Sequence, residues 1–179
     1  MAIREVVIYP DEILRRENKN ITVFDDKLKE LSKDMFDTMY KNDGIGLAGP
    51  QIGVNEKIVV IDLPEEDGSQ GNNQVVLINP EIKKLEGDLI ESEEGCLSVP
   101  GYNDKVQRYE RCTVEYQDLE GNKQIFDNVD GLLAICLQHE IDHLYGKVFV
   151  DKLSRLKRER VHKKYAKYVK DLKAQKEGQ

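Results

Sequence analysis

The run His139-Glu140-Ile141-Asp142-His143 constrains this chain more than any other stretch of its sequence. On an α-helix, residues four positions apart lie on the same face, so the two imidazoles would stand one above the other. Two neutral imidazoles in this arrangement can bind one transition-metal ion, and the glutamate beside them can act as a base toward water at that ion. The run therefore predicts a helix that carries a metal site and a catalytic carboxylate.

The neighbouring residues favour a helix over about 131–145. Apolar side chains recur at helical spacing in phase with both histidines, Asp130 is suited to the N-cap, and Gly146 stands where a helix would end. Because such an apolar stripe normally faces a core, the metal would be shielded from bulk solvent. The third histidine of the chain, His162, lies in a lysine-rich stretch and is expected at the surface.

A catalytic ion of this kind usually takes three protein ligands and leaves one position for water. Cys136 precedes His143 by seven residues, or about 10 Å of helix, too far for one ion to join both. Cys112 belongs to an alternating, half-buried strand and is expected in the core. Cys96 lies in a bend punctuated by glycine and proline, from which its thiolate could reach the helix. Glu159 is a weaker candidate for the third ligand.

The glycine-rich segment 44–53 contains a formal G-x-G-x-x-G pattern. A predicted helix (26–41) precedes it and a predicted strand (57–63) follows it, which reverses the order of a dinucleotide-binding motif, so we reject a nucleotide cofactor. The glycines instead indicate a backbone exposed at close range, suited to docking a peptide as an extra strand. Gln51 carries the only polar side-chain donor of the segment and is a candidate oxyanion partner.

Three segments together resemble the peptide deformylases: Gly44–Gln51, Glu94–Ser98 and Gln138–Leu144. Their order and spacing also fit, and the resemblance covers nearly the whole chain. The compact length and the extended C-terminal helix look like the form common in Gram-negative bacteria. The resemblance implies a metal-dependent hydrolase that removes the formyl group from the N-terminal formylmethionine of newly made polypeptides and releases formate.

The resemblance also implies three groups of site residues. The metal ligands would be Cys96, His139 and His143. The groups that act on the reacting carbonyl would be Glu140, as general acid and base, and the oxyanion donors Gln51 (side-chain amide) and Leu97 (backbone N–H). The residues that contact the peptide would be Ile45, Gly46 and Gly95, through their backbones, and Leu132, Ile135 and Cys136, around its first side chain.

The resemblance further implies iron(II) as the native metal, with zinc, nickel or cobalt as possible substitutes. A set of two imidazoles and a thiolate suits all four by ligand softness. Two positions depart from the family pattern: Gly49 stands where alanine is usual, and Asn103 stands near the position of an arginine in many bacterial members. The first adds backbone freedom before Gln51, and the second removes one expected contact to the peptide.

The order of elements predicts an α+β fold in a single domain over 1–179. We expect antiparallel or mixed sheets packed around the metal-binding helix, with an N-terminal helix at 26–41 and a C-terminal amphipathic helix at about 154–174. The predicted strands lie at 57–63, 75–82, 88–93, 112–117 and 123–128.

The C-terminal region is strongly basic, since residues 152–176 hold eleven Lys or Arg and two acids. Two interpretations stay open: a solvated helix that packs Val161, Tyr165, Tyr168 and Leu172 inward, or a contact with the ribosome. No run is long enough to span a bilayer and the first residues lack a signal-peptide core, so a cytoplasmic protein without a membrane partner is expected.

Two other functions remain possible at this stage. One is an endopeptidase that uses Glu159 as the third metal ligand. The other is an RNA-binding protein in which a metal only braces the fold. A carboxylate next to an open coordination position argues against the second, because a closed structural site has no need of one.

Overall fold

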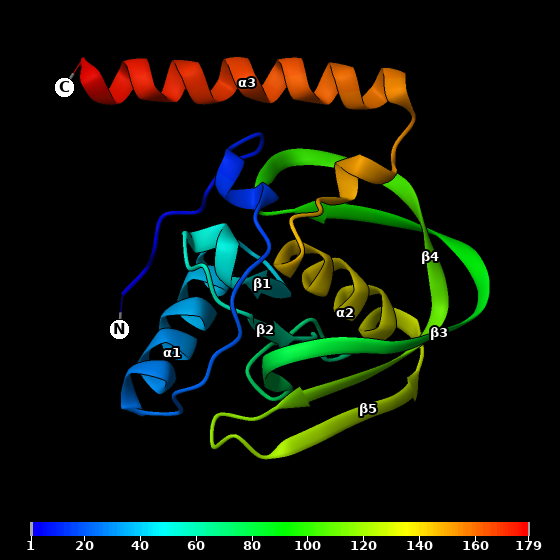
Figure 1. Ribbon diagram of the computed structural model, residues 1–179. Helices are drawn as coiled ribbons and strands as arrows, with labels where there is room; N and C mark the ends of the chain where they lie inside the picture. The colour runs from blue at the N-terminus through cyan, green and yellow to red at the C-terminus, as the bar shows by residue number, and fades with distance from the viewer. Residues whose placement is uncertain (1, 179) are drawn as a thin grey trace.

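The computed structural model describes residues 2–178 as a sheet that curves around a central helix (Figure 1). The helices are α1 (Asp26–Lys41), α2 (Gly131–Leu144) and α3 (Arg155–Glu177). The strands are β1 (Gly46–Ala48), β2 (Ile58–Asp62), β3 (Gln74–Cys96), β4 (Val99–Gln117) and β5 (Lys123–Val129). Three short 3-10 helices are η1 (Glu12–Arg15), η2 (Gly49–Ile52) and η3 (Phe149–Lys152).

The sheet has the strand order β1-β2-β3-β4-β5, and every neighbouring pair is antiparallel. The predicted α+β class, with helices near both ends and a metal-binding helix at the centre, is therefore confirmed. Strand β1 is an edge strand that pairs only with β2. Its other edge thus keeps backbone groups available for an additional extended chain.

Strand β2 is buried on both faces because a helix covers each of them. Val60 belongs to the same core cluster as Met35 of α1, whereas Val59 belongs to the cluster that contains Leu137 of α2. A strand that is covered on both faces requires a continuous run of apolar residues, because an alternating sequence would place polar side chains in a core. The apolar run of β2 therefore fixes α1 and α2 on opposite sides of the sheet.

Strands β3 and β4 are much longer than predicted, and the separate strands expected at 75–82 and 88–93 are one. Gly87 (φ 82°) looks like a turn signal in the sequence, but it lies at a register shift between Glu86 and Leu89, where the ladder bends without reversing. Strand β4 begins at Val99 instead of 112, because its polar, exposed first half is held by pairing with β3. The β3–β4 turn that follows Cys96 results from this long ladder.

The predicted helices are confirmed with small shifts of their ends. Helix α1 has the predicted bounds, and α2 ends one residue earlier than expected. Asp130 occupies the N-cap of α2 as predicted, although its side chain accepts no capping hydrogen bond. Gly146, two residues after the last residue of α2, has a φ of 76°, which suits the chain reversal there.

Helix α3 runs along the outside of the body, at the top of Figure 1. Only Val161 and Tyr165 of this helix are buried, and Leu172 is half-buried. Tyr168 was expected to pack inward but is 41% exposed, because a helix on the rim is covered along one narrow stripe. Within residues 2–178, no helix is both long and apolar enough to cross a membrane.

Candidate metal centre

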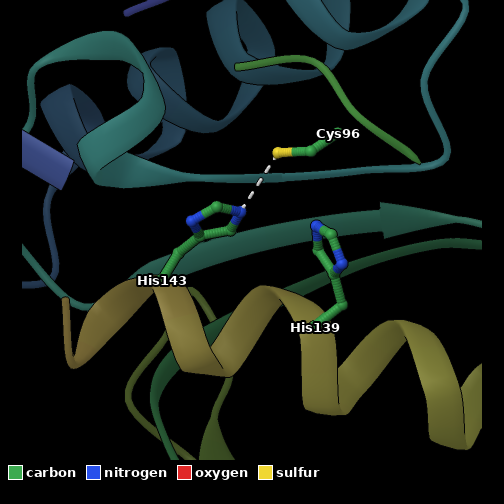
Figure 2. A group of neighbouring side chains, drawn as sticks. All are labelled: Cys96, His139 and His143. Carbon is green, nitrogen blue, oxygen red and sulfur yellow. Dashed lines mark hydrogen bonds between the residues drawn. The ribbon is translucent and has the colours of Figure 1, made fainter. Parts of the chain in front are cut away.

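Two elements far apart in sequence bring one thiol and two imidazoles together. His139 and His143 project from the same side of α2, and Cys96 stands opposite them at the end of β3 (Figure 2). The Cys96 Sγ lies 3.4 Å from His143 Nε2, and the three ligand atoms lie within 4.8 Å of one another. His143 is fully buried and His139 is 7% exposed. The three predicted metal ligands are thus neighbours in space.

The donor set fits a single transition-metal ion. Burial, together with the positive groups His139 and Arg108, holds the pKa of His143 well below its usual range, so this ring is neutral and keeps a lone pair for a metal. The Nδ1 of His139 lies 2.8 Å from the Glu94 carboxylate. Burial lowers the pKa of His139, but its hydrogen bonds with Cys96 and Glu94 outweigh this and raise it, so its Nε2 binds a metal by giving up a proton. Two imidazoles and a thiolate supply three ligands, the number usual in catalytic sites of this type.

A buried ion-pair network supports His139 from behind. Arg108 donates two hydrogen bonds to Glu94, at 2.9 and 2.8 Å, and a third to Asp142 at 2.7 Å. Burial by itself raises the pKa of Glu94, but the hydrogen bonds from Arg108 and His139 outweigh it and lower the pKa to about 2. Glu94 therefore stays ionised and fixes the orientation of the His139 ring.

Sequence reasoning did not assign a role to any member of this network. Glu94 lies two residues before Cys96 and Asp142 precedes His143, so their proximity to ligands was a usable signal. Arg108 carries no such signal, because it reaches the site through the pairing of β4 with β3.

The Glu140 carboxylate is buried at the edge of the metal centre. Its Oε1 lies 3.9 Å from His139 Nε2, and its Oε2 has no hydrogen-bond partner among residues 2–178. Burial raises the pKa of Glu140 to about 7, against the lowering effect of the positive His139. A carboxyl with a pKa near neutrality can both accept and deliver a proton.

The absence of a side chain at Gly46 makes room for Glu140. A Cβ at this position would lie 2.8 Å from Glu140 Oε1 and 2.9 Å from its Cγ, both shorter than ordinary contacts. The glycine-rich segment thus has a packing role at the site. The exposed backbone that the sequence predicted is limited to the cavity-lining residues Gly44–Gly46 and to Gly53, because residues 47–52 are buried.

The side-chain amide of Gln51 has a fixed orientation. Its Oε1 accepts a hydrogen bond from the Ala48 backbone N–H at 2.9 Å, so its Nε2 must point the other way. This nitrogen lies 3.3 Å from Cys96 Sγ and 3.2 Å from Ser98 Oγ. Gln51 is 1% exposed and therefore presents a preset donor to the metal centre.

A cavity of about 490 Å³ opens onto this centre. One wall comes from the residues before and within β1, including Ile45 and Gly46, and the other from the β3–β4 turn, including Gly95 and Leu97. Cys96, His139 and Glu140 also line it. Because β1 is an edge strand, an extended peptide can lie between the two walls.

The predicted first-side-chain residues on α2 do not line this cavity, as far as residues 2–178 define it. Cys136 is buried in the core between α2 and the sheet. Leu132 is 49% exposed, and Ile135 is half-buried. Glu159, the rival third ligand, is an exposed residue of α3 that pairs with Arg155 at 3.1 Å, so the interpretation that used it is wrong.

One thiol and two imidazoles that can hold a metal ion, next to a buried carboxylate whose pKa is raised to about 7, are the arrangement expected of a metal-dependent hydrolase. The sequence matches the family model described as polypeptide deformylase over residues 3–159. The peptide deformylase of Pseudomonas aeruginosa is 48% identical, over 93% of this chain and 96% of the relative. That of Alkalilimnicola ehrlichii is 47% identical, over 94% and 92%.

Solved structures agree with the sequence matches. The crystal structure of a peptide deformylase from Legionella pneumophila has a TM-score of 0.85 and 48% identity, and covers 97% of this chain and 98% of that one. The peptide deformylase from Ehrlichia chaffeensis in complex with actinonin has a TM-score of 0.86 and 40% identity, over 94% and 98%. The chain belongs to the polypeptide deformylase family. It is a metal-dependent enzyme that removes the formyl group from the N-terminal methionine of nascent polypeptides.

Proposed function

We propose that Cys96, His139 and His143 hold the metal ion of this deformylase and that Glu140 is its general acid and base. The observation that carries the proposal is the convergence of the three ligand atoms, within 4.8 Å of one another, beside the unpartnered Oε2 of Glu140. When bound, the ion acts as a Lewis acid and lowers the pKa of coordinated water, to about 7 in zinc sites.

Glu140 handles the protons of the reaction. Its carboxylate accepts a proton from the attacking water and then delivers it to the departing nitrogen, because an amine anion is too poor a leaving group. The pKa of about 7 suits both steps, since the group can be charged for the first and protonated for the second. Glu140 is 5% exposed, so bulk water has little access to that proton.

Gln51 and Leu97 stabilise the negative oxygen that develops on the formyl carbon. The Gln51 Nε2 is preset by the Ala48 contact, and the Leu97 N–H belongs to the turn that lines the cavity. Such donors are most effective when they need no reorganisation during the reaction, and the Ala48 contact gives Gln51 that property. Loss of one such donor typically costs about 2.7–4 kcal/mol of barrier.

The substrate peptide binds as a strand between the two cavity walls. The backbones of Ile45, Gly46 and Gly95 contact it, since all three line the cavity. The side chains assigned to the first residue of the peptide are those of α2 named in the sequence analysis: Leu132, Ile135 and Cys136. None of these three side chains lines the cavity as residues 2–178 form it, so the first side chain of the peptide must extend past the lining residues to reach them. The test compares the rates on formyl-norleucine and formyl-Met peptides in variants at Ile135.

Iron(II) is the proposed native metal, with zinc, nickel or cobalt as substitutes. Thiolate and imidazole ligands suit all of them, and affinity order alone does not select one. The measurement is metal analysis of protein purified without oxygen, together with formate release by each reconstituted form. A zinc-only preparation with full activity would contradict the iron assignment.

We also propose that α3 contacts the ribosome. The enzyme would then act in the cytoplasm, where nascent chains are made. Support comes from the basic composition of α3 and from its small contact with the body, which leaves most of the helix exposed. A chain that ends after Tyr168 keeps both buried residues of α3. The shorter chain lacks Lys170, Lys173 and Lys176, so its unchanged co-sedimentation with ribosomes would contradict a contact made by these three lysines.

Glu140→Ala is the direct test of the proposed mechanism. We expect this variant to keep its metal and to lose nearly all formate release from a formyl-Met peptide, because only the proton transfers are removed. Cys96→Ala should instead lose the metal. Glu159→Ala is the matched control, since this exposed carboxylate lies on α3 and should leave metal content and rate at wild-type values. Wild-type turnover by the Glu140 variant would overturn the assignment.

A further inference from the structure

A second cavity, of about 230 Å³, lies between α3 and the start of β4. Its lining residues are Tyr102, Lys157, Arg160, Val161 and Lys164. The three cations are spaced by three and four residues, so they line one side of the helix. This cavity is lined by positive groups, unlike the one at the metal centre.

The second cavity and the substrate cavity share one lining residue. Tyr102 lines both of them. Helix α3 is fixed to the same turn, because the Tyr165 hydroxyl donates to the Pro100 carbonyl at 2.6 Å. The Tyr102 ring stacks on Phe149, with ring centroids 6.3 Å apart, and its hydroxyl donates to Asp104 at 2.7 Å. A polypeptide that leaves the substrate cavity over Tyr102 therefore reaches the cations of α3.

Two of the three cations are free to bind an anion. Lys157 pairs with Asp104 at 3.1 Å, so its charge is already compensated. Arg160 and Lys164 form no ion pair with any residue in the range 2–178, although the Lys164 ammonium lies 5.5 Å from the centre of the Tyr165 ring. Both side chains are exposed, and they stand one helical turn apart on the same side.

We propose that Arg160 and Lys164 form a downstream subsite that binds a carboxylate side chain of the substrate polypeptide. Nascent chains with Asp or Glu a few residues after the formylmethionine are then deformylated more efficiently than chains with Lys there. The subsite rests on the proposed placement of the peptide in the metal-centre cavity. Each extended residue advances the chain by about 3.3 Å, so the position of the preferred acid reports the path of the peptide over Tyr102.

The test is a set of formyl-Met peptides with alanine at every downstream position except one, which carries Asp, Ala or Lys in turn. For the wild-type enzyme at low ionic strength, we expect kcat/KM to be about two- to fivefold higher for Asp than for Ala at one or two adjacent positions. The difference should appear in KM, because the subsite is remote from the reacting bond, and should shrink as salt screens the charges.

The double variant Arg160→Glu and Lys164→Glu should reverse the preference, so that Lys is favoured over Asp at the same positions. The matched control is Lys163→Glu and Lys170→Glu, which changes the net charge equally on the side of α3 that faces away from the cavity. This control should keep the wild-type preference. The ratio of Asp to Ala peptides is compared within each variant, so a general change in rate does not enter.

Three outcomes would overturn the subsite. The first is an equal kcat/KM for Asp and Lys peptides at every position in the wild-type enzyme. The second is an unchanged preference in the Arg160 and Lys164 variant. The third is an equal loss of preference in the control variant, which would show that the preference comes from the total charge of α3 and not from Arg160 and Lys164. Weaker binding of ribosomal RNA by the first variant, with its peptide preference intact, would assign the two cations to RNA instead.

A failure of the proposed metal-centre mechanism can be distinguished from a failure of the subsite. The all-alanine formyl-Met peptide needs no acidic side chain, so formate release from it depends only on the metal centre. An enzyme that turns over this peptide but shows no charge preference refutes the subsite and leaves the metal-centre assignment intact.

Discussion

Replacement of Glu94 by Gln tests whether the buried ion-pair network prepares His139 for the metal. The Glu94 carboxylate accepts two N–H groups of Arg108 and lies 2.8 Å from His139 Nδ1. Glutamine has the same shape, but only one of its two terminal atoms accepts hydrogen bonds. Its amide NH₂ must face either the guanidinium or the imidazole N–H, so one of these contacts is lost and the charge is removed.

The magnitude follows from the burial of Arg108, whose side chain is 2% exposed. Removal of one partner from a buried ion pair typically costs about 3–5 kcal/mol. Asp142 still accepts from Arg108 at 2.7 Å, so we expect the lower end, about 3 kcal/mol, in the free energy of unfolding of the metal-free protein. Loss of the partner behind His139 should also weaken metal binding by about 10- to 100-fold.

Two measurements check this prediction: urea unfolding of the metal-free protein and a chelator competition for the metal. Glu91→Gln is the matched control. Glu91 lies on the same strand and pairs with Lys105 at 2.9 Å, but its side chain is 56% exposed. That pair should contribute less than about 1 kcal/mol, and its loss should leave metal affinity unchanged. A Glu94 variant with wild-type stability and metal affinity would refute the reasoning.

Three further substitutions test the packing of the site. Gly46→Ala places a Cβ 2.8 Å from Glu140 Oε1, so kcat should fall by about 100-fold with metal content retained, and wild-type kcat would contradict this. Gly49→Ala places a Cβ 2.8 Å from the Glu56 backbone carbonyl, so the free energy of unfolding measured with urea should fall by about 1–3 kcal/mol. Wild-type stability in this variant would show that the backbone can shift to accept the methyl group. Tyr165→Phe removes a buried donor and should lower the free energy of unfolding by about 1 kcal/mol, whereas an unchanged midpoint would show that the hydrogen bond contributes nothing.

The departure at Gly49 has a structural reason that the sequence did not reveal. In the sequence it looks like added backbone freedom before Gln51. In the structure, the Glu56 and Val54 carbonyls lie close to its Cα, at 2.8 and 3.1 Å from the position of an added Cβ. The glycine therefore permits a close approach of two backbone segments. Asn103, the second departure, lines the substrate cavity, where its short side chain leaves the wall without a cation.

The parts of the fold that sequence predicted correctly are those set by local spacing. Helix α1 and the metal-binding helix α2 follow from apolar residues that recur every three to four positions, and β2 follows from an uninterrupted apolar run. The long strands β3 and β4 were predicted only in part. Their exposed halves have little apolar alternation, and the separate strands predicted at 75–82 and 88–93 are one ladder with a register shift between Glu86 and Leu89.

The sequence by itself determined the chemistry of this protein: two histidines at helical spacing, a glutamate beside the first, and a cysteine in a glycine-flanked bend. Such features depend on residues within a few positions of one another, so periodicity and turn chemistry are enough to read them. Only the tertiary structure decided that Glu94 and Arg108 hold His139, because these contacts join residues 14 and 45 positions apart. Strand register and helix packing bring such residues together, and both depend on how the whole chain fills its core.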